Sequence, residues 1–135
     1  MLLTSVLPGI NLLAVLVAGV VHIVLGLLWF QPKVFGNAWT KLTGRDMKPA
    51  TRWMPAGIVG HLLMSFVLAV IVKLANATTA LDGALVGILV CLGFVATMLV
   101  GELIWEKIPF KLFVVRAGNQ LVGFAISGII LGTWR

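Results

Sequence analysis

Four long apolar segments, separated by only three short polar stretches, account for almost the whole of this 135-residue chain. Hydrophobic residues make up 61% of it and charged residues only 10%, whereas about 25% of the residues of a soluble domain are charged. A helix that spans a bilayer needs roughly 20 predominantly apolar residues. The sequence therefore predicts four membrane-spanning helices, over about residues 10–30, 55–75, 81–104 and 112–131.

The apolar runs are continuous rather than alternating, which favours helices over the strands of a membrane β-barrel. The first run lacks a basic stretch before it and is longer than the apolar core of a cleaved signal, so we expect a retained first helix. The expected fold is one all-α domain over residues 1–135, an integral membrane four-helix bundle.

Basic residues are concentrated in the first and third connections, which contain Lys33, Lys41, Arg45, Lys48, Arg52, Lys107 and Lys111. Short loops rich in Lys and Arg stay on the cytoplasmic side of a membrane. We therefore expect a multi-pass protein of the cell membrane with both termini outside and both basic loops in the cytoplasm. The net charge of +6 then reflects topology and contact with the lipid bilayer rather than binding of nucleic acid.

The first loop is predicted to contain a short helix of its own. Pro32 opens it, Phe35 and Trp39 are spaced to share an apolar face, and Gly44 ends it. Such a helix is expected to lie in the headgroup layer with Phe35 and Trp39 in the lipid.

A resemblance to a known family rests on the pattern W-F-x-P-x-x-F-G-x-x-W, formed by Trp29, Phe30, Pro32, Phe35, Gly36 and Trp39. This pattern, after a first apolar helix, resembles the uncharacterised membrane family catalogued as domain of unknown function 1761. Residues 81–83 and 111–118 are similar to later segments of that family. The resemblance implies a compact four-helix membrane protein, and it implies no catalytic residues because the family has no assigned activity.

Six polar residues inside the apolar segments form the candidate site, which we call the polar layer: His22, His61, Glu102, Arg116, Asn119 and Gln120. At about 1.5 Å per residue, the histidines lie roughly 10 Å from the cytoplasmic ends of their helices. An ionisable group inside a membrane costs about 2.5 kcal/mol or more and usually faces the interior of the bundle. We expect these side chains to face one another, with Glu102 paired to Arg116.

Three functional hypotheses follow for the polar layer. The first is passage of a small solute or ion, because imidazole can change its charge near neutral pH. The second is a purely structural or scaffolding role. The third is a haem or metal site that uses His22 and His61, although two histidines without further ligands make a poor zinc site. An enzyme is less favoured, because no nucleophile stands at a diagnostic spacing, and we expect no cofactor.

Glycine pairs in the third and fourth spans predict close helix contacts. Gly83 with Gly87, and Gly128 with Gly132, have the spacing at which membrane helices approach each other. We expect them to join copies of the chain in a homo-oligomer. The lone Cys91 is expected to be a small buried apolar residue.

A faint internal repeat relates the two halves of the chain. Leu27, Trp29 and Pro32 recur as Leu103, Trp105 and Pro109. The pattern predicts two similar helical hairpins related by an axis along the membrane normal.

Overall fold

The computed structural model describes residues 2–134, and these form helices joined by short connections, with no β-strand among them. The long elements are α2 (Leu12–Trp29), α4 (Met54–Leu74), α5 (Ala80–Val90) continued by η4 (Cys91–Ala96) and α6 (Thr97–Trp105), and α7 (Phe110–Thr133). The shorter helical segments are α1 (Leu2–Val6), η1 (Leu7–Gly9), η2 (Pro32–Gly36), α3 (Asn37–Thr43) and η3 (Thr51–Trp53).

The four expected spans are confirmed as helices long and apolar enough to cross a membrane: Leu12–Trp29, Thr51–Leu74, Ala80–Trp105 and Phe110–Thr133. Large apolar side chains remain exposed along them, with Leu27 at 67% and Met98 at 80% exposure. Exposure on this scale is unfavourable in water but ordinary against hydrocarbon. The all-α fold is therefore confirmed, and it is compatible with a multi-pass membrane protein.

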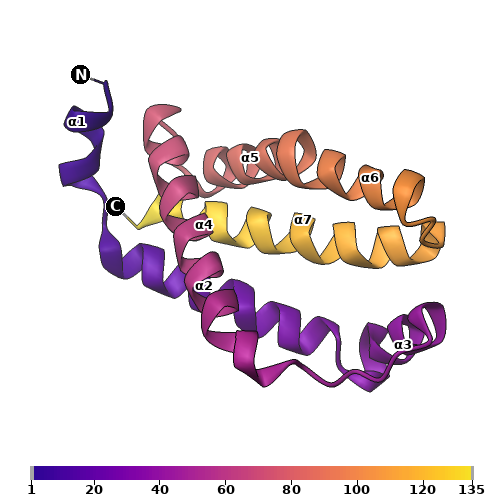
Figure 1. Ribbon diagram of the computed structural model, residues 1–135. Coiled ribbons are helices and arrows are strands. Elements are labelled where there is room, and N and C mark those ends of the chain that lie inside the picture. The colour runs from indigo at the N-terminus through magenta and orange to yellow at the C-terminus, as the bar shows by residue number, and fades with distance from the viewer. Residues whose placement is uncertain (1, 135) are drawn as a thin grey trace.

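The helices are arranged as a bundle in which one member is strongly inclined (Figure 1). The segment from α5 through α6 runs side by side with α7, and α2 lies on the other side of α7. Helix α4 crosses α2 and α7 steeply. Helix α7 therefore contacts all the other long helices and forms the centre of the fold.

The closest helix contact is between α5 and α7, and it is made by glycine. A Cβ atom at Gly83 would overlap the carbonyl oxygen of Gly128, and one at Gly87 would overlap that of Phe124. Gly132 also lies against Gly83. These glycines were expected to join two copies of the chain, and that expectation is wrong because they are already used inside one copy. Their spacing marked a close contact correctly but did not identify the partner helix.

Two long helices begin at side-chain caps that the local sequence explains. The Asn11 side chain accepts hydrogen bonds from the N–H groups of Leu13 and Ala14, both at 3.1 Å, at the start of α2. The Thr79 hydroxyl accepts from the N–H of Asp82 at 3.1 Å at the start of α5. Asn and Thr are preferred here because the first N–H groups of a helix have no partner within it.

The segment after α2 folds into a tight corner that uses the motif residues. The ring of Phe35 stacks on that of Trp29, with centroids 4.7 Å apart. The N–H of Gly36 donates to Gln31 O at 2.9 Å, and a Cβ at Gly36 would overlap the carbonyl of Phe30. The short helix is confirmed, as is its end at Gly44, which has φ +66°. However, Phe35 packs within the chain instead of pointing freely into lipid.

The expected similarity of the two hairpins is not seen in their packing. Helices α5 and α7 run closely side by side, whereas α4 crosses α2 steeply (Figure 1). The repeated residues also differ in environment, because Trp29 is partly buried and Trp105 is 84% exposed.

The side chain of Trp29 joins the end of α2 to α7 by a hydrogen bond. Its indole N–H donates to Val115 O at 3.1 Å, so we expect Trp29→Phe to lower the free energy of unfolding by about 1 kcal/mol. Trp29→Ala also removes the stacked ring and should cost about 3 kcal/mol. Denaturant-induced unfolding in detergent, monitored by circular dichroism, measures both losses. Trp105→Phe is the matched control and should have almost no effect; an equal loss there would contradict the assigned role of Trp29.

Candidate functional site

The candidate site is built on an antiparallel contact between α2 and α7. From one end to the other, Trp29 lies against Gly118, Gly26 faces Asn119, and His22 lies on Gly123. The hydroxyl of Ser127 then approaches Ala18 O at 3.5 Å. Small residues on one helix thus make room for polar or aromatic residues on the other, as in the packing faces of membrane helices.

His22 occupies the centre of this contact and is 1% exposed. Its ring lies so close to Gly123 that a Cβ there would overlap it. The ring of Phe124 contacts it edge-on, with centroids 5.6 Å apart. Neither ring nitrogen has a hydrogen-bond partner among the described residues. A buried polar group without a partner costs about 1–3 kcal/mol, so this position needs an explanation.

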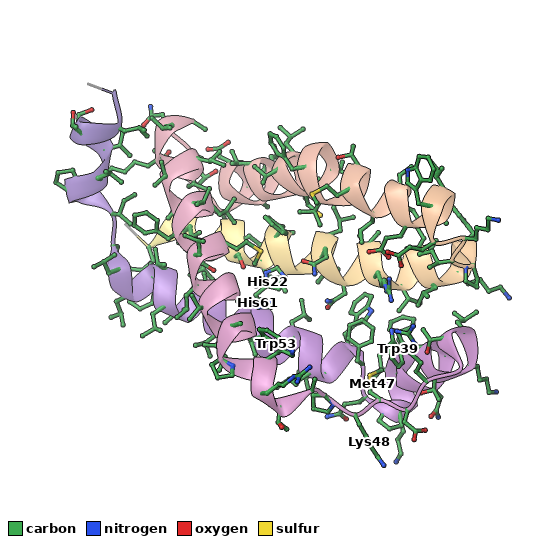
Figure 2. The ribbon with its side chains drawn as sticks, in the orientation of Figure 1. His22, Trp39, Met47, Lys48, Trp53 and His61 are labelled. Carbon is green, nitrogen blue, oxygen red and sulfur yellow. The ribbon has the colours of Figure 1, made fainter. Side chains whose placement is uncertain are left out.

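His61 meets His22 from α4 at the crossing of the two helices, as Figure 2 shows. The two rings are edge-on, with centroids 5.4 Å apart. The Nδ1 of His61 is 2.8 Å from Gly57 O. A carbonyl only accepts hydrogen bonds, so the proton of a neutral His61 is on Nδ1, and Nε2 is left as an acceptor. His61 is only partly buried, unlike His22.

Two further residues of the polar layer come from α7. Asn119 is 6% exposed, and its Oδ1 has no partner among the described residues. Gln120 lies beside the ring of His22 without a hydrogen bond of good geometry. The hydroxyl of Ser65 on α4 is also buried and unpaired, so several polar groups with unused hydrogen-bonding capacity meet at this junction.

Glu102 and Arg116 form the ion pair expected from the sequence. The Arg116 guanidinium donates from Nη1 to the Glu102 carboxylate, which joins α6 to α7. Their side chains are 27% and 30% exposed, respectively. The pair is therefore neither a free surface contact nor a deeply buried one.

The six predicted site residues thus occupy two neighbouring places along α7. His22, His61, Asn119 and Gln120 meet where α2, α4 and α7 contact one another, and Glu102 pairs with Arg116 nearer the start of α7. Three participants were not among the predicted site residues: Ser65, Phe124 and Ser127. The helical spacing of Ser65 after His61, and of Ser127 after Gly123, was the signal for two of them. Gly57 lies one turn before His61 on the same face of α4, but a Cβ added there would meet no neighbour within 4 Å, so this glycine takes no part in the helix contact.

The geometry disfavours a haem held between the two histidines. Their rings touch, His22 is enclosed by Gly123 and Phe124, and a macrocycle would have to separate them. A metal ion would need further ligands, and no group of three or more His, Cys, Asp or Glu residues occurs within residues 2–134. Cys91 is a free, buried thiol, in agreement with its expected packing role.

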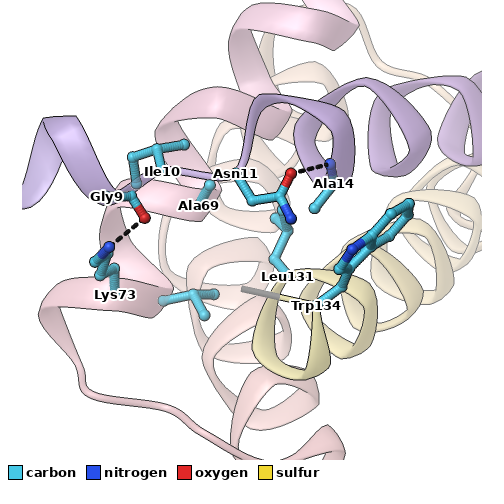
Figure 3. A pocket seen from close by; sticks show the side chains of 9 residues that line it. Gly9, Ile10, Asn11, Ala14, Ala69, Lys73, Leu131 and Trp134 are labelled. Atoms are coloured by element: carbon cyan, nitrogen blue, oxygen red, sulfur yellow. Dashed lines mark hydrogen bonds between the residues drawn. The ribbon is translucent and has the colours of Figure 1, made fainter.

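A small pocket of about 70 Å³ lies at the opposite end of the bundle (Figure 3). The ammonium of Lys73, at the end of α4, donates to Gly9 O there. Asn11 is used in capping α2. The ammonium of Lys73 and the side-chain oxygen of Asn11 are therefore engaged within the chain. We assign this pocket to the attachment of η1 to α4.

Comparison with protein families identifies the relatives of this chain. Residues 13–132 match the family described as Protein of unknown function (DUF1761). The chain belongs to this family. The comparisons with curated proteins and with solved structures give no match.

The aromatic motif between Trp29 and Trp39, on which the resemblance to DUF1761 rests, has a structural role. Trp29 and Phe35 stack, and Gly36 allows the chain to pass close to Phe30. These residues build the corner between α2 and α3 and tie it to α7 through Val115. In this DUF1761 member, the motif therefore positions helices, and the polar side chains lie elsewhere.

Proposed function

We propose that this chain is a multi-pass protein of the cell membrane that lets a small ion, most simply a proton, pass through the polar layer. The carrying observation is His22, a buried imidazole with both ring nitrogens unpaired and in contact with a second imidazole. Imidazole can both take up and release a proton near neutral pH. In this proposal both termini are outside and the two basic loops are cytoplasmic.

The tight packing favours a proton over a larger solute. His22 is 1% exposed and lies directly on Gly123, so a hydrated solute has no room beside it. A proton needs only groups that exchange hydrogen bonds, with water where a gap remains. The unpaired oxygens of Ser65 and Asn119 supply further partners for such water.

The residues suggest an order for the path. His61 is the more exposed imidazole and meets His22, and Gln120 lies beside the His22 ring. Gln120 and Arg116 are four residues apart on α7 and therefore share a face. The Arg116 and Glu102 pair then stands at the end of the path towards the basic loops.

The second candidate is a structural role for the whole layer. It is favoured by the closed pair of Glu102 with Arg116 and by the bond of His61 to Gly57 O. In that case each substitution should affect stability and activity in the same proportion. Ion passage instead requires a substitution that removes flux and leaves the fold intact.

His22→Phe makes that separation. Phenylalanine keeps an aromatic ring against Phe124 and carries no polar atom, so removal of the unpaired buried nitrogens offsets the cost of fitting a slightly larger ring beside Gly123. We expect an unfolding temperature close to the native one and at least about a tenfold loss of proton flux, equivalent to about 1.4 kcal/mol. The measurement uses liposomes with an internal pH-sensitive dye, an imposed pH gradient and a clamped membrane potential.

The matched control is Phe124→Leu, which alters the packing around the same ring and removes no polar group. Its flux should equal that of the native chain even where its stability falls. A native chain no faster than protein-free liposomes contradicts the proposal, as does full flux in His22→Phe. Equal flux losses in both variants would favour the structural role.

We also propose that the protein assembles as a homo-oligomer. The glycines of α5 and α7 are used within the chain, so the contact must lie elsewhere. A suitable place is formed by η3 and the first turns of α4, because residues 51–60 are all exposed and Gly57 and Gly60 have open space around them. The subunit count follows from native mass spectrometry of the same preparation.

A further inference from the structure

A second polar cavity, of about 240 Å³, lies beyond Arg116, near the end of the bundle where α3 and the α6–α7 turn meet. Segments that are distant in the sequence form its walls: the end of α3 with Arg45, the turn with Lys107, and the first turns of α7 with Arg116. Folding thus brings together three cationic side chains that the sequence separates by up to 71 residues. Glu106 is the only carboxylate that lines this cavity.

The positive charge in this cavity is incompletely neutralised. Among residues 2–134, the ion pair of Arg116 with Glu102 is the only salt bridge, so Arg45 and Lys107 have no carboxylate partner within 4.0 Å. Arg116 uses its Nη1 group for Glu102, and a guanidinium has five N–H donors in all. Donors are therefore left on each of the three cations.

The turn that carries Lys107 is closely defined. Lys107 has φ +51°, a region that non-glycine residues rarely adopt. The N–H groups of Glu106 and Ile108 both donate to Glu102 O, at 3.1 and 3.4 Å. The backbone carbonyl of Glu102 therefore closes the turn that carries Lys107, and its side chain pairs with Arg116. One residue thus fixes the positions of both Lys107 and Arg116.

We infer that this cavity binds a phosphate group, carried by an anionic lipid headgroup or by a phosphorylated solute. Arginine offers a planar fork of donors that matches phosphate, and lysine adds a point charge. The hydroxyl of Thr43 also lines the cavity. The surrounding loops are the basic ones, and in the proposed orientation they face the anionic cytoplasmic leaflet. The inference concerns binding alone and holds whether or not the histidines pass protons.

A simpler explanation for the same cations makes a different prediction. Arg45 and Lys107 follow the last turns of α3 and α6, where a positive charge also stabilises the free carbonyl groups of a helix end. In that case their substitution should lower stability and leave phosphate binding unchanged.

The test is titration of the full chain in maltoside micelles, with binding followed by calorimetry. The probes are dihexanoyl phosphatidic acid, dihexanoyl phosphatidylcholine and inorganic phosphate. We expect the double variant Arg45→Gln with Lys107→Gln to bind phosphatidic acid at least about tenfold more weakly than the native chain, at an unfolding temperature close to the native one. Glu106→Gln removes the opposing carboxylate and should bind more tightly.

The control is the double variant Lys33→Gln with Lys48→Gln. It removes the same total charge from the basic first loop, at residues outside this cavity, and its affinity should change less than about twofold. Equal weakening in both double variants would show diffuse attraction and overturn the inference. No binding of either anion by the native chain would do so as well. Tight binding of phosphatidic acid alone identifies a lipid headgroup, and equal binding of inorganic phosphate identifies a solute.

Discussion

Replacing Gly83 with alanine should be among the most damaging single-methyl changes in this protein. The added Cβ would overlap the backbone of Gly128, and backbone cannot rotate away as a side chain can. Overpacking of this kind costs about 3 kcal/mol, so we expect a large fall in the free energy of unfolding. Denaturant titration of the detergent-solubilised protein measures it, and earlier reaction of the buried Cys91 thiol should accompany it.

Gly93→Ala is the matched control for that experiment. It introduces the same methyl group in the same span, at η4, where nothing lies within 4 Å of the added atom. Alanine also favours helix over glycine by about 1 kcal/mol, so this variant should be as stable as the native chain or more so. If the two alanine variants were equally stable, the close contact between α5 and α7 would be wrong.

Breaking the pair of Glu102 with Arg116 is expected to have the second large effect. Exposed ion pairs contribute about 1 kcal/mol or less, whereas removing one partner of a buried pair costs about 3–5 kcal/mol. Both side chains are about 30% exposed or less, so Glu102→Gln and Arg116→Gln should each cost about 2 kcal/mol. The double variant leaves no unpaired charge and should cost less than the sum of the two.

A double-mutant cycle, measured by unfolding in detergent, checks this pair directly. Glu106→Gln is its control, because this carboxylate follows one turn later, is exposed and has no salt bridge among the described residues. Its effect should stay within about 0.5 kcal/mol. Strictly additive losses at Glu102 and Arg116 would mean that the two residues act independently.

The spans could be predicted because their signal is local. A run such as residues 112–131 shows its length and apolar character directly, and the observed helix Phe110–Thr133 agrees with it. The partners of the helices carry no such signal. Gly83 and Gly128 indicated a close contact, but whether that contact lies within one chain or between two depends on how the helices are ordered around α7. The inclination of α4 likewise depends on its packing against α2 and α7, which are distant from it in the sequence.

The candidate site could be predicted in part, because its polar residues stand out within apolar segments of the sequence. The free-energy cost of placing polar groups in a membrane led to the expectation that these residues face one another. In the structure His22 contacts His61, and Glu102 pairs with Arg116. The sequence could not distinguish the depth of burial of the two histidines, because that depends on Gly123 and Phe124 of a distant helix. Nor could it reveal the cavity beyond Arg116, since Arg45 and Lys107 are brought together only by the fold.

The central position of α7 has a consequence for how the protein is made. The helices that carry His22 and His61 are synthesised before α7, the span to which Asn119, Gln120 and Gly123 belong. Until that span enters the bilayer, the imidazole of His22 lacks the surface on which it is packed. A polar group is costly in hydrocarbon, so the first spans should remain loosely associated or partly hydrated during synthesis. Assembly of the site is thereby tied to the synthesis and insertion of α7.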